Sequence, residues 1–238
     1  MTLFLPLLLT VFTPSASAGE RLFAYSYGYG TVPRGGVEVE HYATAQEDGG
    51  GTEWAHQVEL EYGITDQLEA GLYLVAEQPA AGALAFAGYK ARLKYRFGSA
   101  GVGPVDTAIY FEYIGSPAFD THGVEAKLIF GKTLGSFEAA LNAEYKLTFG
   151  EGLEHEIEPT LGLGYKITPH FLLGAEVRNE IEWAGTEPAG VFLWAGPTVH
   201  LAGEGGKLWW TLTTLFATTN ATRDDHAYIV RSLVAVNL

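Results

Sequence analysis

The sequence predicts an all-β protein, a transmembrane antiparallel up-and-down β-barrel of about twelve strands, and two observations carry this prediction. First, segments of about ten residues with alternating apolar and polar side chains, such as Val37–Thr44 and Gly174–Trp183, recur along the chain. This alternation gives each strand one apolar face and one charged face. Second, the chain begins with a short apolar segment typical of export. Together they indicate the outer membrane of a Gram-negative cell.

Residues 1–18 are predicted to be a cleaved signal peptide. Leu3–Phe12 is almost entirely apolar, and Ala16–Ala18 supplies the small-x-small pattern of a cleavage site. The apolar run is shorter than the ~20 residues that a membrane-spanning helix needs. We therefore expect residues 19–35 to form an N-terminal periplasmic or lumenal segment and residues 36–238 to form the outer-membrane barrel.

Turn signals rich in Gly, Pro and Asp divide the rest of the chain into strands. In order, the expected strands are 36–46, 53–63, 67–77, 84–97, 104–114, 121–132, 136–149, 154–167, 170–183, 190–202, 207–219 and 226–238. The turns after the even-numbered strands are mostly tight, as periplasmic turns are, and the opposite set is expected to face outside. Because Glu20–Gly30 also alternates, a barrel of fourteen strands is the alternative. Pro159 and Pro197 fall inside strands, where bulges are expected.

Composition agrees with an exported barrel. The chain carries 28 Asp and Glu against 14 Lys and Arg, a net charge of −14, which argues against nucleic acid as a partner. The chain has no Cys, so disulfides cannot stabilise it, whereas a closed ladder of hydrogen bonds can. Aromatic residues at the ends of the apolar face would form the two interfacial girdles. A soluble β-sandwich with the apolar face as its core is the alternative.

Charged side chains on the opposite face are expected to line a pore. The predicted pore-lining residues are Glu59, Glu61, Glu69, Lys90, Arg92, Lys94, Arg96, Asp106, Glu112, Glu176, Arg178 and Arg231. The four bases from Lys90 to Arg96 occupy every second position of one strand, which suggests a rail for an anionic solute facing an acidic wall. Alternatively, opposite charges pair across neighbouring strands and fill the interior. Inward glycines such as Gly71 and Gly162 either leave space or bend the strands.

No catalytic motif is present, so we expect no enzyme. His155-Glu156 lacks the second His of H-E-x-x-H, and G-x-S-x-G does not occur. His41 and Ser232 both face outward on the first and last strands, but no acid partner accompanies them. We expect no cofactor and no metal site. The acidic groups Glu154–Glu156 and Asp224–His226 are interpreted as a solvated rim, with a divalent cation that bridges lipopolysaccharide as the alternative.

Three stretches carry a resemblance to a known family. They are Val32–Tyr42, Leu60–Tyr73 and Glu156–Val177. They are similar to small proteobacterial outer-membrane β-barrels known only as domains of unknown function or as proposed transporters. This resemblance implies the barrel fold and the outer-membrane location, and no substrate.

A narrow passive channel for small hydrophilic or anionic solutes is the function that these observations favour. A non-conducting structural or partner-binding barrel with a salt-bridged lumen is the alternative, and a lipid-modifying enzyme is a third possibility. The expected partners are outer-membrane lipid, lipopolysaccharide and small solutes, and no nucleic acid.

Overall fold

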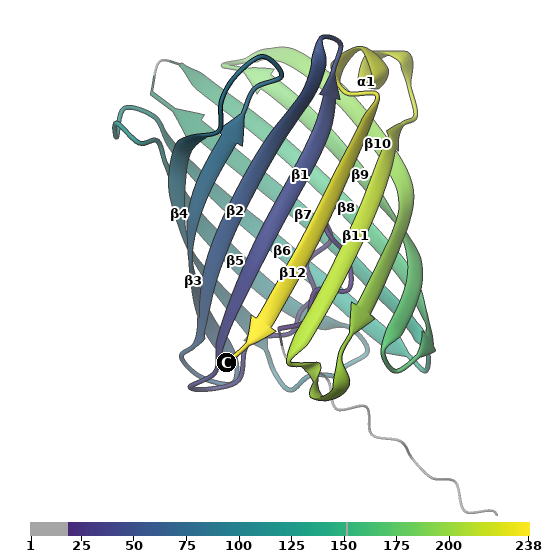
Figure 1. The fold of residues 1–238 in the computed structure, drawn as a ribbon. Helices are drawn as coiled ribbons and strands as arrows, with labels where there is room; N and C mark the ends of the chain where they lie inside the picture. Colours follow the sequence, from purple (N-terminus) through teal and green to yellow (C-terminus); the bar gives the residue numbers. More distant parts are fainter. Residues whose placement is uncertain (1–18, 151) are drawn as a thin grey trace, which may run out of the picture.

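The computed structural model describes residues 19–150 and 152–238, and these residues form a closed antiparallel β-barrel (Figure 1). Its twelve strands follow one another around the barrel in sequence order. The first six are β1 (Val37–Asp48), β2 (Gly51–Gly63), β3 (Leu68–Gln78), β4 (Ala85–Phe97), β5 (Asp106–Gly115) and β6 (His122–Leu134). The others are β7 (Phe137–Phe149), β8 (Leu153–Thr168), β9 (Phe171–Ala184), β10 (Glu187–Ala202), β11 (Leu208–Ala217) and β12 (Tyr228–Asn237). The predicted signal peptide lies outside the described residues.

The barrel closes because β1 pairs with β12 in an antiparallel register that runs from Glu38 opposite Asn237 to Gln46 opposite Ile229. Closure leaves no strand edge exposed. The prediction of a twelve-stranded barrel is confirmed, and the fourteen-stranded alternative is wrong because Glu20–Gly30 joins no strand. The largest boundary error is at β10, which begins at Glu187 and not at residue 190.

Alternation along each strand separates an apolar outer surface from a polar interior. In β3, Leu72 and Leu74 are 62% and 63% exposed, whereas Tyr73 between them is 3% exposed. The same contrast appears in β5, where Phe111 is exposed and Glu112 is buried. Because exposed leucines and phenylalanines surround the barrel, its outer surface suits hydrocarbon and not water.

Neither predicted proline bulge is present. The pairing register is the same on both sides of Pro159 in β8 and of Pro197 in β10, and only the ladder pairs at each proline are missing toward one neighbour. Each proline lacks a backbone N–H, and the strand accommodates the missing hydrogen bond without an inserted residue. Register shifts occur instead at Val75/Ala76, Lys166/Thr168 and Pro188/Gly190.

The two ends of the barrel differ. The C-terminus lies at one end of the barrel, where two residues connect β6 to β7 and eight connect β4 to β5 (Figure 1). The 3₁₀ turn η1 (Glu204–Gly206) connects β10 to β11 at this end, and the opposite end, called here the loop end, carries the helix α1 (Asn220–Asp225) between β11 and β12. Among the described residues, no helix has the length and apolar character needed to cross a membrane.

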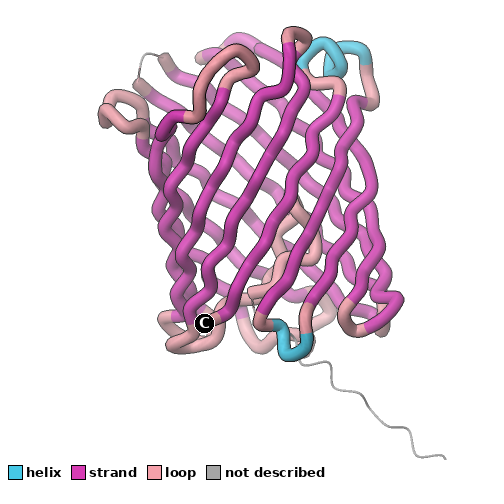
Figure 2. Tube along the Cα trace, in the orientation of Figure 1, coloured by secondary structure: helices cyan, strands magenta, loops and turns pink. Residues whose placement is uncertain are grey.

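Residues 19–36, called here the inner segment, enter the barrel before β1 begins. Figures 1 and 2 show this segment inside the half of the barrel nearer the C-terminus, as a loop without strand structure. Phe23, Ala24, Tyr25 and Ser26 are all at most 6% exposed. Ala24 and Tyr25 pack in a buried cluster with side chains of the barrel wall. The largest apolar cluster of the described residues therefore lies between the inner segment and the wall.

Candidate functional site

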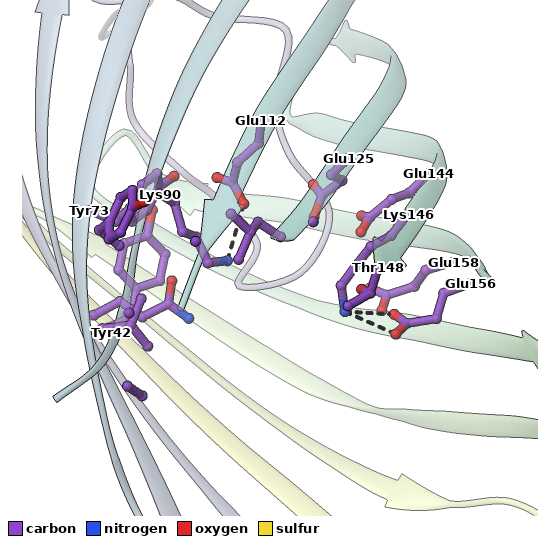
Figure 3. A pocket seen from close by; sticks show the side chains of 18 of the residues that line it. Tyr42, Tyr73, Lys90, Glu112, Glu125, Glu144, Lys146, Thr148, Glu156 and Glu158 are labelled. Atoms are coloured by element: carbon purple, nitrogen blue, oxygen red, sulfur yellow. Dashed lines mark hydrogen bonds and ion pairs between the residues drawn. The ribbon is translucent and has the colours of Figure 1, made fainter. Parts of the chain in front are cut away.

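A polar cavity of about 430 Å³ occupies the lumen between the inner segment and the loop end (Figure 3). Tyr25 and Tyr27 of the inner segment line it, and we call these two side chains its floor. Glu77, Gly115 and Thr148, at or near the ends of β3, β5 and β7, also line it, so it extends to the loop end of the barrel. Strand alternation positions the wall, because every second side chain points inward.

Opposite charges balance within the cavity wall. Six glutamates line it, Glu77, Glu112, Glu125, Glu144, Glu156 and Glu158, together with five bases, Lys90, Lys127, Lys146, Arg178 and Arg231. Most of the bases pair with a glutamate: Lys90 Nζ lies 3.1 Å from Glu112 and Lys146 Nζ lies 2.9 Å from Glu156, in each case on the neighbouring strand (Figure 3). Lys127 Nζ lies 2.9 Å from Glu144 on the neighbouring strand and 3.1 Å from Glu125 on its own strand, and Arg178 Nη2 lies 2.5 Å from Glu158. The wall is therefore polar but nearly neutral.

Basic side chains of the wall contact the rings of the two floor tyrosines. Lys127 Nζ lies 4.1 Å from the centre of the Tyr27 ring, and Arg231 Cζ lies 4.2 Å from that of Tyr25. Such contacts favour a cation over an aromatic face. Burial raises the pKa of the Tyr25 phenol, against the opposing effect of Arg231 and Arg178, so this hydroxyl stays neutral.

Arg231 is the base in the cavity whose charge is not matched by a salt bridge within the described chain. Its Nε donates a hydrogen bond to Thr44 Oγ1 at 2.9 Å. Arg231 is therefore the basic side chain best placed to meet a polar solute at the floor.

Glu176 of β9 holds the backbone of the inner segment. Its carboxylate accepts hydrogen bonds from the amides of Ala24, Tyr25 and Ser26 at 2.9, 2.9 and 2.7 Å. Thr213 Oγ1 donates a fourth at 2.6 Å. Hydrogen bonds to an ionised, buried acceptor are stronger than those between neutral groups. One side chain therefore satisfies three successive amides.

Other side chains of the wall also form hydrogen bonds with the backbone of the inner segment. Asn142 of β7 accepts a hydrogen bond from the Tyr27 amide at 2.6 Å and donates one to the Tyr27 carbonyl at 3.0 Å. Glu69 accepts from the Val32 amide at 2.6 Å. The wall thus uses side chains, and not strand pairing, to satisfy much of the backbone of the inner segment.

Glycines of the wall make room for aromatic side chains of the inner segment. A Cβ on Gly162 would lie 2.6 Å from the Phe23 ring, and one on Gly131 would lie 2.4 Å from the Tyr29 ring. Such distances do not allow a side chain at either position. At Gly162, the inward space expected from the sequence exists and the inner segment fills it. Gly71 similarly admits the Arg92 and Glu59 side chains.

A second group of charges lies deeper in the wall. Arg92, with 1% of its side chain exposed, contacts Glu59 at 2.5 Å and Glu69 at 2.7 Å, and it also contacts Glu61. Lys94 Nζ lies 2.9 Å from Glu69. This is the cross-strand pairing that the sequence left as an alternative to a rail.

The four bases of the proposed rail therefore occupy three different environments. Lys90 faces the cavity, Arg92 and Lys94 are buried in the deeper group, and Arg96 donates to the carbonyls of Gly98 and Asp66 at the turns. They do not form one continuous basic surface.

The remaining predicted pore-lining residues also lie in the interior, at different places. Glu112, Arg178 and Arg231 line the cavity, and Glu176 binds the inner segment. Asp106 is buried near the turn before β5, where it accepts from the Gly101 amide at 2.6 Å. Tyr25 and Tyr27 also line the cavity, and they were not among the predicted pore-lining residues. The alternation of aromatic side chains in Glu20–Gly30 was the signal that could have indicated them.

The outward Ser and His do not form a catalytic pair. His41 Nε2 lies 3.3 Å from His56 Nδ1, and Ser232 Oγ accepts a hydrogen bond from Trp210 Nε1 at 2.9 Å. In the register of β1 and β12, Ser232 stands opposite Ala43 and not opposite His41. At the rim, Glu156 is neutralised by Lys146.

Solved structures of porins share this fold. A NanC porin aligns over 85% of this chain and 100% of its own, with a TM-score of 0.59 and 8% identity. A KdgM porin aligns over 84% and 99%, with a TM-score of 0.58 and 9% identity. A KdgM porin in complex with disordered oligogalacturonate aligns over 84% and 97%, with a TM-score of 0.56 and 9% identity. At these identities the likeness concerns the fold alone.

No curated protein matches the sequence. A family model, in contrast, matches residues 15–136 and 135–221, which together exceed half of the chain. The chain belongs to DUF6662, a family of unknown function.

Proposed function

We propose that the protein is an outer-membrane channel for small hydrophilic solutes that its own N-terminal segment closes. The observation that carries this proposal is the position of Tyr25 and Tyr27, which line the polar cavity from within the lumen. A solute that enters from the loop end would meet them there. Passage through the barrel then requires the inner segment to move.

The outer-membrane location is supported by the exposed apolar surface, by strands of ten to sixteen residues and by the shared porin fold. A transmembrane β-strand needs about 9–11 residues. In this proposal the signal peptide is removed during export, the end that holds the C-terminus faces the periplasm and the loop end faces the cell exterior.

The charge balance of the cavity favours neutral or zwitterionic hydrophilic solutes over anions. Six glutamates and five bases line it, and most of the bases are paired. Tyrosine faces beside paired charges offer stacking surfaces and hydrogen-bonding groups together. We therefore assign the small hydrophilic solutes, and not the anionic ones, to this channel.

The inner segment is suited to leave the lumen because it belongs to no strand. It is held by side chains such as Glu176 and Asn142, so its release breaks no ladder hydrogen bond of the barrel. Local openings that leave the strand ladder intact cost less free energy than global unfolding does.

Planar-bilayer recording tests the proposal. We expect the wild-type protein to be mostly closed, and we expect the double variant Glu176→Gln/Asn142→Ala to conduct ions for a much larger fraction of the time. Glu187→Gln, at an exposed carboxylate of the loop end, is the matched control and should behave like the wild type.

A thiol at position 26 distinguishes a channel that the inner segment closes from a barrel that has no pore. The chain has no Cys and the Ser26 hydroxyl has no hydrogen-bond partner in the described residues, so Ser26→Cys gives a unique, well-tolerated probe. If the double variant exposes this thiol to a soluble maleimide and still carries no current, the channel proposal is wrong.

A non-conducting structural barrel is the second candidate, and the buried contacts of Arg92 with Glu59, Glu61 and Glu69 favour it. Such a network fills the lumen near the wall and stiffens the barrel. This candidate predicts that the maleimide-accessible double variant remains silent in the bilayer.

A further inference from the structure

Three carboxylates converge in the interior beside the start of the inner segment. Glu38 and Glu40 are 0% exposed and Glu61 is 3% exposed. One oxygen from each lies within 4.8 Å of the others. Like charges this close in a buried place repel one another strongly unless a cation or protons join them.

Two oxygens of this group accept no hydrogen bond, although the Asn237 side chain also lies near Glu38. Trp209 Nε1 donates to Glu38 Oε2 at 3.1 Å, and the Tyr42 hydroxyl donates to Glu40 Oε2. Oε1 of Glu38 and Oε1 of Glu40 accept no hydrogen bond from any described residue, although both atoms are buried. Buried carboxylate oxygens without partners are costly, so these two atoms indicate a missing donor.

The neighbouring cations are engaged elsewhere. Arg92 contacts Glu59, Glu61 and Glu69, and Lys94 contacts Glu69. The Arg21 guanidinium is close enough to interact electrostatically with Glu40, but its hydrogen bonds go to the Tyr42 hydroxyl at 3.0 Å and to the Ala24 carbonyl at 2.8 Å. Neither Glu38 nor Glu40 therefore forms a salt bridge with a cation of the described residues.

Gly19 lies beside Glu38. It is buried, and a Cβ built on it would lie 3.3 Å from Glu38 Oε1. Its backbone nitrogen is bonded to the same Cα, at about 1.46 Å, so an ammonium group on this residue starts one bond from that point. Gly19 is also the residue that follows the predicted cleavage site Ala16–Ala18.

We propose that the α-ammonium group of Gly19, formed by cleavage after Ala18, is the cation that Glu38 and Glu40 bind. Water supplies the hydroxyl that joins the Ala18 carbonyl carbon and the proton that joins the Gly19 nitrogen, and the peptidase of the export pathway catalyses this hydrolysis. The new amine is protonated at neutral pH, because α-amino groups have pKa values of about 7.7–8.0.

This ion pair couples export to closure of the lumen. Before cleavage, residue 19 offers one neutral amide hydrogen, and afterwards it offers a charge and three donors. The mature chain therefore attaches the start of its inner segment to β1 only after processing. The inference requires the inner segment to lie as the structure shows, and it does not depend on whether the barrel conducts.

The test compares two chains that differ by one residue. The first starts at Gly19, and the second retains Ala18, which moves the ammonium group by about 3.8 Å along the chain. Each chain is prepared with and without Glu38→Gln, and all four proteins are refolded in vesicles. The fraction folded is established by heat-modifiable gel migration, so that only folded barrels are compared.

Two readouts are measured. The first is the rate at which an anhydride acylates the terminal amine at neutral pH, followed by peptide mass spectrometry. We expect at least a tenfold slower rate for the Gly19 chain than for the Ala18 chain, and we expect Glu38→Gln to remove this protection. The second is the urea midpoint of unfolding, which Glu38→Gln should lower in the Gly19 chain and leave unchanged or raise in the Ala18 chain.

Several outcomes overturn the proposal. Equal acylation rates in the two chains, or an equal effect of Glu38→Gln on both midpoints, show that the amine does not bind the carboxylates. A midpoint of the Gly19 chain that rises with added Ca²⁺ and falls with a chelator assigns the cluster to a metal ion instead. A mature protein isolated from the membrane whose intact mass begins at a residue other than Gly19 also excludes it.

Discussion

At the scale of single residues, side chains of the wall hold the inner segment inside the lumen. Glu176 alone accepts three successive amides of the inner segment, and Gly162 and Gly131 leave room for two of its rings. These residues lie on strands, and the atoms that they meet lie more than a hundred positions away in the sequence. Each can therefore be tested by one substitution that leaves the strand pattern unchanged.

Glu176→Gln should release the inner segment from the wall. The amide retains the shape but loses the charge that strengthens three hydrogen bonds, at a cost of about 2–4 kcal/mol. We expect the thiol of a Ser26→Cys protein to react with maleimide at least tenfold faster in this variant. Glu187→Gln, on the exposed loop end, is the control, and an unchanged rate in Glu176→Gln would show that this carboxylate does not hold the segment.

Gly162→Val should displace Phe23 from the wall. A Cβ at Gly162 would lie 2.6 Å from the Phe23 ring, whereas one at Gly28 of the inner segment would meet nothing within 4 Å. We expect Gly162→Val to increase the reactivity of the Ser26→Cys thiol and Gly28→Ala to leave it unchanged. Similar rates in both variants would contradict the close fit between Phe23 and the wall.

Arg92→Met should destabilise the barrel because it leaves Glu59, Glu61 and Glu69 in the interior with less positive charge. Removing one partner from a buried ion pair costs about 3–5 kcal/mol. We expect a clear fall in the urea midpoint of unfolding in vesicles. Arg96→Met, at the turns, should cost about 1 kcal/mol or less. Equal midpoints for the two variants would show that the buried network adds no stability.

At the scale of strands, alternation alone locates almost every element. Each strand must present apolar side chains outward and polar ones inward, so a shift by one residue would place carboxylates in hydrocarbon. The sequence could not locate the irregularities. Pro159 and Pro197, where bulges were expected, cause no register shift, because the neighbouring pairs retain the ladder on both sides.

Leu72→Arg should weaken the barrel through contact with lipid. Leu72 is 62% exposed in the middle of β3, where a charge near the bilayer centre costs about 2–4 kcal/mol. Val102→Arg, at a position 80% exposed in the turn before β5, should cost almost nothing. Folding titrations in vesicles compare the two. Equal costs would show that β3 does not face hydrocarbon.

At the scale of the whole molecule, closure of the sheet and occupation of its lumen together define the state of the protein. The pairing of β1 with β12 makes the barrel, and the inner segment divides its lumen into a packed half and a polar half. The cavity is therefore bounded on one side by a segment that lies outside the sheet.

An opened lumen should prefer cations weakly. Six glutamates and five bases line the cavity, and release of the inner segment adds the carboxylate of Glu176 to the open path. Rings of carboxylates favour cations in pores. In a KCl gradient, the reversal potential of the Glu176→Gln/Asn142→Ala variant should therefore be nearer zero than that measured during the openings of Asn142→Ala, which retains the Glu176 carboxylate. A preference for chloride in Asn142→Ala would contradict the assignment of hydrophilic, non-anionic solutes.

The sequence by itself determined the barrel, its strand number and the face on which each charge lies, because period-two alternation is a local property that lipid and closure both demand. Only the tertiary structure decided which charges meet and what fills the lumen. Arg92 reaches carboxylates on two other strands, and Glu176 reaches amides about 150 positions away, and neither partner can be read from alternation. Such contacts depend on how the closed wall is curved and on where a segment without strand pairing comes to lie.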